Sequence, residues 1–199
     1  MGKDGCSTRH PTRRHDVDTQ ESIADALLTT LRTRRSIRAW QERPIPRETL
    51  ERMLEAATWA PSADNLQPWR FIVLQGARKQ ELAALLRRFV DGLQPGLNPV
   101  LWMHRVGLRR AAGLIERAPA VITAWASFSP QDTALRFVAS GDLTPLFTWT
   151  MVVQSVAAAV QNLLLAAHAL GLGAVWMGYP NLAGREIKAW LQAEGELQA

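Results

Sequence analysis

The chain has 199 residues, 47% of them apolar, which is enough for one domain that buries most of its unfolded surface. Its 23 lysines and arginines exceed its 18 aspartates and glutamates, and the formal net charge of +5 favours anionic small molecules but also fits weak, nonspecific nucleic-acid binding. No helix-turn-helix or zinc-finger spacing accompanies this charge, so we expect no nucleic-acid partner.

Residues 1–17 are polar and basic without hydrophobic periodicity, so we expect a disordered N-terminal arm. The arm holds the one cysteine of the chain, Cys6, so no internal disulfide is possible and a cytoplasmic location is expected. The arm also lacks the apolar core of a signal peptide. The most hydrophobic stretch, residues 146–177, is interrupted by polar residues and is therefore not expected to span a membrane.

A first helix is predicted after Asp18, which forms an acidic capping box with Glu21. One stripe of this helix recurs at helical spacing and is expected to be buried: Ile23, Ala26, Leu27, Thr30 and Leu31. Its C-terminal end delivers residues 34–38 (RRSIR), in which three guanidiniums and a hydroxyl can match the oxygens of a phosphate. Arginines at a helix end also satisfy its last carbonyls, so this segment alone equally fits a solvated helix end.

A second helix is predicted to open at Pro46 and to end at Pro61. Its apolar face is that of a core helix: Leu50, Met53, Leu54, Ala57 and Ala60. The loop that follows, residues 60–69, has side chains whose donors and acceptors suit the edge of a planar heterocycle: Ser62, Asn65 and Gln67. Asn65 has an alternative role as an amide that only stabilises its own loop.

The remaining residues predict an α+β domain with a small sheet and helices packed around it. The expected elements are strands at 69–74, 120–128 and 173–178, and helices at 76–92, 147–170 and from about residue 181. Residues 93–117 fit either a lid over a site or a packed helix, and residues 129–146 are ambiguous. The helix over 147–170 is apolar nearly all round, so it is either the central helix of a monomer or part of a dimer interface.

Two segments in order, RRSIR at 34–38 and APSADNLQPWRF at 60–71, resemble the nitroreductase family of flavin enzymes. The resemblance extends from about Ser22 to about Leu191. It implies a nitroreductase-like fold, a small central and mainly antiparallel sheet surrounded by helices, and a homodimer that holds FMN noncovalently at its interface. It further implies reduction of the flavin by NADH or NADPH, followed by reduction of a nitroaromatic, quinone or activated-alkene acceptor.

The resemblance also assigns roles to individual residues. The segment matched to the FMN phosphate and ribityl chain contributes Arg34, Arg35, Ser36 and Arg38. The loop matched to the side of the isoalloxazine contributes Pro61, Ser62, Asn65 and Gln67. The strand end whose backbone amide approaches flavin N5 contributes Trp176, Met177 and Gly178, and we expect the amide of Met177 or Gly178 to support the charge that develops there.

No other catalytic pattern is present in the sequence. There is no Ser-His-Asp order, no HExxH and no metal-ligand spacing, and the four histidines are scattered: His10, His15, His104 and His168. The absence of GxGxxG argues against a Rossmann dehydrogenase and, with one candidate flavin cradle, predicts that donor and acceptor take turns in a ping-pong mechanism.

Two departures from the family pattern stand out. Ala63 and Asp64 occupy positions where the family usually has small residues, often glycine. The chain ends at Ala199, without the further strand and basic residue that usually follow. We therefore expect one FMN-binding domain over residues 18–199 that lacks the usual C-terminal strand. The alternative is a flavin-binding or flavin-free scaffold with little catalysis.

Overall fold

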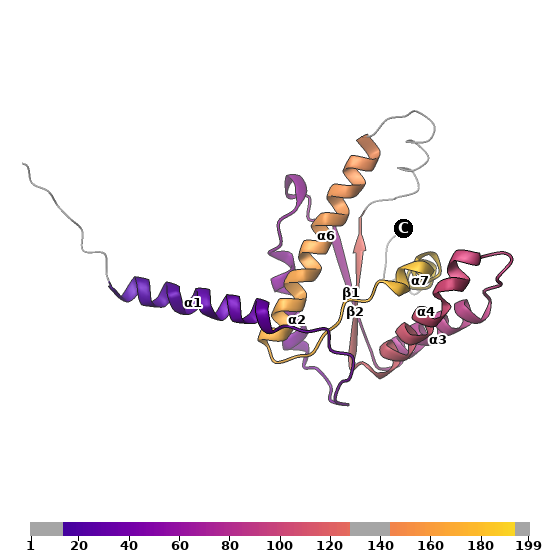
Figure 1. Ribbon diagram of the computed structural model, residues 1–199, viewed down its shortest axis with the longest axis horizontal. Coiled ribbons are helices and arrows are strands. Elements are labelled where there is room, and N and C mark those ends of the chain that lie inside the picture. The colour runs from indigo at the N-terminus through magenta and orange to yellow at the C-terminus, as the bar shows by residue number, and fades with distance from the viewer. Residues whose placement is uncertain (1–13, 128–143, 194–199) are drawn as a thin grey trace, which may run out of the picture. The chain divides into compact units, whose positions relative to one another are not determined.

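The computed structural model describes residues 14–127 and 144–193 (Figure 1). Most of the expected arm, including Cys6, and most of the ambiguous connection at 129–146 lie outside these ranges. The chain divides into two compact units, Met1–Arg34 and Arg35–Ala199. The domain boundaries inferred from the sequence, 1–17 and 18–199, remain predictions.

The described part of the first unit is helix α1 (Arg14–Thr33). Asp18 lies inside this helix, so the predicted capping box is wrong: the residues from Arg14 to Asp18 include no proline or glycine that would delay its start. The stripe predicted to be buried is exposed at Ile23, Leu27 and Leu31. The described part of this unit is one helix, which offers its own apolar stripe no partner, and this explains the difference.

The second unit contains the other predicted helices and two of the three predicted strands. In chain order its elements are α2 (Arg47–Thr58), η1 (Ala63–Asn65), β1 (Trp69–Gln75), α3 (Gly76–Asp91), α4 (Pro99–Arg117), β2 (Ala120–Ala126), α6 (Thr144–Ala169), η2 (Tyr179–Ala183) and α7 (Gly184–Ala193). This is the predicted α+β class, with a small antiparallel sheet and helices around it.

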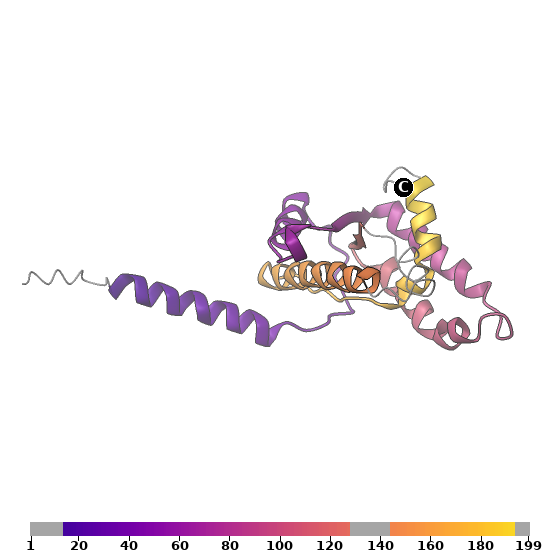
Figure 2. The same cartoon turned by 90° about the horizontal axis from the view of Figure 1, so that it is seen from above.

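Strands β1 and β2 pair in antiparallel register, with Trp69 opposite Ala126 and Gln75 opposite Ala120. Alternate residues of each strand point to opposite faces, so each face has its own core. Phe71 and Ile122 pack with α2 and α6, whereas Val121 and Trp125 pack with α3, α4 and α7. Figure 2 shows the two strands between these two groups of helices.

Residues 93–117 are a packed helix over most of their length, because α4 occupies Pro99–Arg117. The second half of α4 is buried against α3 and η2 through Leu108, Ala112 and Ile115. The first half leaves Val100 and Met103 exposed. The buried residues of the second half favour a packed helix over a lid. The first half showed no clear periodic face in the sequence, which is why both alternatives were open.

Helix α6 packs on α2 along the other face of the sheet. Ala159 and Leu163 are buried there, and Asn162 Nδ2 donates a hydrogen bond to the carbonyl oxygen of Ala56 (3.2 Å). Residues 146–169 are long and apolar enough to cross a membrane by length and composition alone, a test that core helices of soluble proteins also pass. About a third of the tested window is buried, so much of its apolar surface is uncovered within this chain.

The C-terminal end of α4 is tied to α3 by one residue, Glu116. Its carboxylate accepts hydrogen bonds from both terminal nitrogens of the Arg87 guanidinium, with Nη1 at 2.9 Å from Oε1. Its backbone carbonyl accepts from Lys79 Nζ (2.7 Å) and Gln80 Nε2 (3.1 Å). The hydrogen bond with Arg87, and to a lesser degree the nearby charges, lower the pKa of the Glu116 carboxyl.

This lowered pKa predicts a pH-dependent stability difference between the wild type and Glu116→Gln. A carboxyl whose pKa is lower when folded stabilises the fold above its ordinary pKa, near 4.3, and this contribution is lost as the pH falls through the folded pKa. In urea denaturation, wild type should therefore be slightly more stable than the variant at pH 7, and the gap should close toward pH 3. The exposed Glu55→Gln serves as the control. A gap that stays constant between these pH values would contradict the prediction.

Candidate functional site

The segment after Arg35 meets the segment after α6 through a parallel bridge between Ser36 and Ala174. The backbone N–H of Ile37 donates to the carbonyl oxygen of Ala174 (3.1 Å), and Trp40 Nε1 donates to that of Gly173 (3.1 Å). Because these bonds tie residues 36–40 to the residues just before Trp176, they bring two of the three predicted cofactor segments together.

A glycine turn directs the chain from α6 into this bridge. Gly171 has φ +76, a left-handed conformation that glycine adopts without strain. Its N–H donates to the carbonyl oxygen of His168 (3.0 Å), and the N–H of Leu172 donates to that of Ala167 (2.8 Å). This pair of bonds is a Schellman motif, which ends a helix and fixes the direction of the departing chain.

Residues 173–178 do not form the predicted strand. Within the described part of the chain, their backbone makes one bridge, Ser36 with Ala174, and no ladder with β2. The chain then enters η2, which contains Pro180, and the N–H of Asn181 donates to the carbonyl oxygen of Gly178 (3.1 Å). The turn that begins at Gly178 ends this segment, and its pairing within the described chain is limited to Ser36, a distant residue that the local sequence pattern could not reveal.

The predicted N5-facing amides, those of Met177 and Gly178, lie at this turn. Among residues 14–127 and 144–193, no acceptor takes a hydrogen bond from either N–H. Met177 is half-buried against the core of α3, α4 and α7, whereas Trp176 is exposed. The two amides are thus backbone donors without an acceptor among the described residues, as a site for a developing negative charge requires.

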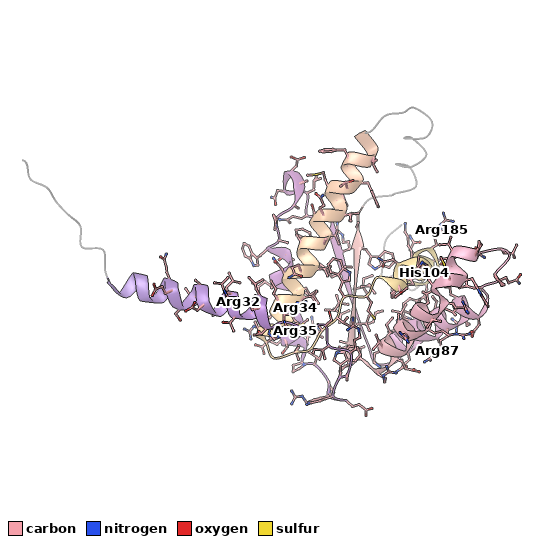
Figure 3. The ribbon with its side chains drawn as sticks, in the orientation of Figure 1. Arg32, Arg34, Arg35, Arg87, His104 and Arg185 are labelled. Atoms are coloured by element: carbon pink, nitrogen blue, oxygen red, sulfur yellow. The ribbon has the colours of Figure 1, made fainter. Side chains whose placement is uncertain are left out.

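The arginines of the basic segment differ in their positions. Arg34 closes the first unit, with its N–H donating to the carbonyl oxygen of Thr30 (3.1 Å), and Arg35 opens the second. Arg38 Nη1 donates to the carbonyl oxygen of Ser36 (3.2 Å), so this guanidinium lies over its own turn. Figure 3 labels Arg35 close to the C-terminal end of α6.

A cavity of about 950 Å³ adjoins the bridge. Ile37, Trp176 and Met177 line it on the side of the bridge, and β2 lines it along its length. Its walls are mostly apolar and include Trp40, with Arg43 as a charged residue at the lining. A cavity of this size and lining can accept a small organic molecule.

The third predicted segment, residues 61–67, is a tightly bonded loop. Ser62 Oγ accepts from the N–H of Gln67 (3.0 Å), and Asn65 Oδ1 accepts from Gln67 Nε2 (3.2 Å). Asp64, Asn65 and Gln67 all have positive φ, between 46 and 53. A position with φ near +50 favours glycine, so Asp64 holds a backbone conformation that residues other than glycine rarely adopt. The bond to Asn65 supports its alternative role as a loop-stabilising amide.

This loop attaches to a different part of α6 from the bridge. The N–H of Ala63 donates to Ser155 Oγ (3.2 Å), whereas the bridge follows from the turn at Ala167. The twelve residues from Ser155 to Ala167 span roughly 18 Å of helix axis. Figure 1 likewise shows the loop after α2 beside the end of α6 opposite to the one from which the bridge segment leaves. Within residues 14–127 and 144–193, no hydrogen bond joins residues 61–67 to residues 36–38 or 176–178.

Two residues at these segments, Ser155 and Tyr179, were not singled out from the sequence. Ser155 holds the loop, and its only sequence signal is a polar residue inside an apolar helix. The ring of Tyr179, next to Gly178, packs against that of His104, with centroids 5.9 Å apart; Figure 3 labels His104. A contact between residues so distant in sequence gives no periodic signal. The described ranges contain no group of three or more His, Cys, Asp or Glu residues placed to hold a metal ion.

Comparison with known proteins identifies relatives of this chain. The family model of the nitroreductase family matches residues 31–199. A Methanothermobacter thermautotrophicus protein named as an NADH dehydrogenase/NAD(P)H nitroreductase is 36% identical over 165 residues, covering 82% of this chain and 66% of the relative. The chain thus spans just under two thirds of that relative's length.

The solved structures with folds similar to this chain include those of flavin proteins. A BluB-like flavoprotein from Clostridium difficile 630 has a TM-score of 0.69 and 25% identity, and the match covers 86% of this chain and 83% of that one. A nitroreductase in complex with FMN from Desulfovibrio desulfuricans has a TM-score of 0.57 and 29% identity, and covers 82% and 75%.

Proposed function

Since the chain belongs to the nitroreductase family, we propose that it is an FMN-dependent oxidoreductase that uses NADH or NADPH to reduce a small-molecule acceptor. FMN, when bound, would supply hydride transfer through its N5 atom. The name of the Methanothermobacter relative and the FMN complex from Desulfovibrio support this class. Nitroaromatics, quinones and activated alkenes are the acceptors that we propose. We also propose a cytoplasmic location, supported only by the cysteine content.

The observation that carries the proposal is the bridge between Ser36 and Ala174. It ties a segment rich in guanidinium groups to one that ends in two backbone N–H groups without acceptors in the described chain. An anionic phosphate suits the first group of donors, and a ring atom that gains electron density suits the second. The residues present therefore fit a flavin mononucleotide, with Ser36 and Arg38 toward the phosphate and the amides of Met177 and Gly178 toward the ring.

Visible absorbance of the purified protein tests the proposal directly. A bound oxidised flavin absorbs near 450 nm in general, and NADPH or NADH should bleach this band under anaerobic conditions. Steady-state rates with both donors, on protein of measured flavin content, would then identify the preferred one. Bound flavin that neither donor reduces, or a protein that binds no flavin, would favour the alternative of a scaffold with little catalysis.

We propose that the protein is a homodimer and that the second copy supplies the loop at 61–67 to the site. Among the described residues no hydrogen bond joins this loop to the other two segments, and apolar residues at the loop are exposed, including Leu66 and Trp59. The first part of α6 also exposes Phe147 and Val153. Exposed apolar patches of this kind are typical of interfaces, and an isologous dimer would cover them twice.

The dimer proposal makes a measurable prediction about mass in solution. Light scattering at micromolar concentration should give about twice the 22.1 kDa of one chain, and Phe147→Glu should shift the mass toward that of one chain, because a charge buried at an interface is costly. Arg52→Glu, which places a negative charge at an exposed position of α2, is the control. A flavin-loaded and active monomer would refute both the dimer and the shared site.

The kinetic prediction is a ping-pong pattern. The cavity of about 950 Å³ is lined by Met177, one of the two residues whose amides were predicted to face N5, and the sequence has no dinucleotide fingerprint, so donor and acceptor are expected to occupy the same place in turn. Double-reciprocal plots with varied donor at several acceptor concentrations should give parallel lines. Intersecting lines would mean that both substrates bind together and would require a second nucleotide site.

A further inference from the structure

Among residues 20–127 and 146–192, Ser155 is the one polar or charged residue that is buried, with 5% of its surface exposed. It lies in the first half of α6, on the side that contacts η1. Its Oγ donates to the carbonyl oxygen of Met151 (2.8 Å) and accepts from the backbone N–H of Ala63 (3.2 Å). A hydroxyl is the small group that can do both at once.

The loop that Ser155 holds is unfavourable by itself. Asp64, Asn65 and Gln67 have positive φ, a conformation that residues other than glycine rarely adopt. Such a backbone conformation persists where the surrounding contacts impose it. Two of those contacts lie inside the loop, from Gln67 to Ser62 and to Asn65. Among the described residues, the side-chain hydrogen bond that joins this loop to the rest of the chain is the one from the N–H of Ala63 to Ser155 Oγ.

We propose that Ser155 is a positioning residue that fixes the conformation of residues 61–67, so that Ser62, Asn65 and Gln67 present a constant edge to the cofactor. The part that concerns the cofactor rests on the proposed function. The part that concerns the loop rests only on the hydrogen bonds and backbone angles above. Ser155 itself acts through Ala63 and is not assigned a contact with the flavin.

The opposing explanation is that Ser155 is merely a buried hydroxyl that has found a partner. Helical serines and threonines commonly donate to the carbonyl four residues earlier, and Thr150 does this on the same helix, donating to Leu146 (2.8 Å). That bond alone satisfies the Ser155 donor. It does not explain why the oxygen also faces the N–H of Ala63. Thr150, which has the first bond and no described bond to the loop, is therefore a matched control.

Hydrogen exchange of the Ala63 amide tests the loop directly, without flavin. In Ser155→Ala this amide should exchange at least tenfold faster than in wild type, while Thr150→Ala should leave it unchanged. Ser155→Thr keeps the hydroxyl and should restore most of the protection. If Ser155→Ala does not fold, Ser155→Cys keeps the volume with a much weaker acceptor and takes its place. Unchanged Ala63 exchange in a folded variant would overturn the proposal.

FMN titration of the same variants tests the part that depends on the cofactor. Ser155→Ala should raise the Kd for FMN about five- to tenfold and alter the visible circular dichroism of the bound flavin, a signal that a purely structural role would leave unchanged. Faster Ala63 exchange with unchanged Kd and dichroism would overturn the link between loop and cofactor. If wild type binds no FMN, the proposed function fails, but the exchange experiment still decides whether Ser155 fixes the loop.

Discussion

Replacing Gly173 with alanine is expected to separate the two segments that meet at the Ser36–Ala174 bridge. A Cβ at position 173 would lie 2.8 Å from Ile37 Cγ2 and 2.9 Å from Ile37 Cβ, closer than packed carbon atoms approach. The inner atom is a Cβ, so a rotation of the Ile37 side chain cannot relieve the whole clash. Overpacking of this kind costs about 1–3 kcal/mol in the free energy of unfolding. If FMN binds where we propose, its affinity should fall as well.

Urea denaturation and FMN fluorescence titration measure the two effects. The control is Gly184→Ala, because a Cβ there meets no atom within 4 Å and α7 begins at that residue, so the change should be neutral or slightly stabilising. The double variant Gly173→Ala with Ile37→Gly removes the side chain that the new Cβ would meet. Its loss of stability should therefore be smaller than the sum of the losses in the two single variants. Unaltered stability and FMN affinity in Gly173→Ala would show that the bridge does not govern the site.

Local patterns were sufficient to predict most helices. The apolar face of Leu50, Met53 and Ala57 predicted α2, and these residues are buried. The long helix was predicted to end at residue 170, and the positive φ and Schellman bonds at Gly171 show how it ends there. Both signals lie within a few residues of their effect, which is why one sequence suffices to read them.

Features that depend on contacts between distant residues could not be predicted in this way. The strand expected at 173–178 is a single bridge to Ser36, a partner far away in the sequence that local patterns do not indicate. The bond between Ala63 and Ser155 joins residues 92 apart. For the candidate site, the residue assignments came from the resemblance. The structure adds that segments 36–38 and 174–178 meet at the bridge, whereas no hydrogen bond among the described residues joins the loop at 61–67 to them.

Replacing Arg38 with alanine is expected to weaken FMN binding by about 1.5–3 kcal/mol, the range of a hydrogen bond to a charged group, or roughly 10- to 150-fold in Kd. The reason is that Arg38 follows Ser36 directly at the bridge, and its guanidinium lies over the same turn through the bond from Nη1 to the Ser36 carbonyl. A phosphate at that turn would accept from the guanidinium fork in two places, which a lysine cannot reproduce.

Arg38→Lys should therefore recover only part of the affinity, and the loss should shrink at high salt as charge attraction is screened. Arg52→Ala removes the same charge from an exposed position of α2 and controls for the change in net charge. Fluorescence titration at two salt concentrations compares all three variants with wild type. Equal Kd values for wild type and Arg38→Ala would remove this arginine from the site, while equal losses in Arg38→Ala and Arg52→Ala would mean that the overall positive charge, and not a phosphate cradle, attracts the flavin.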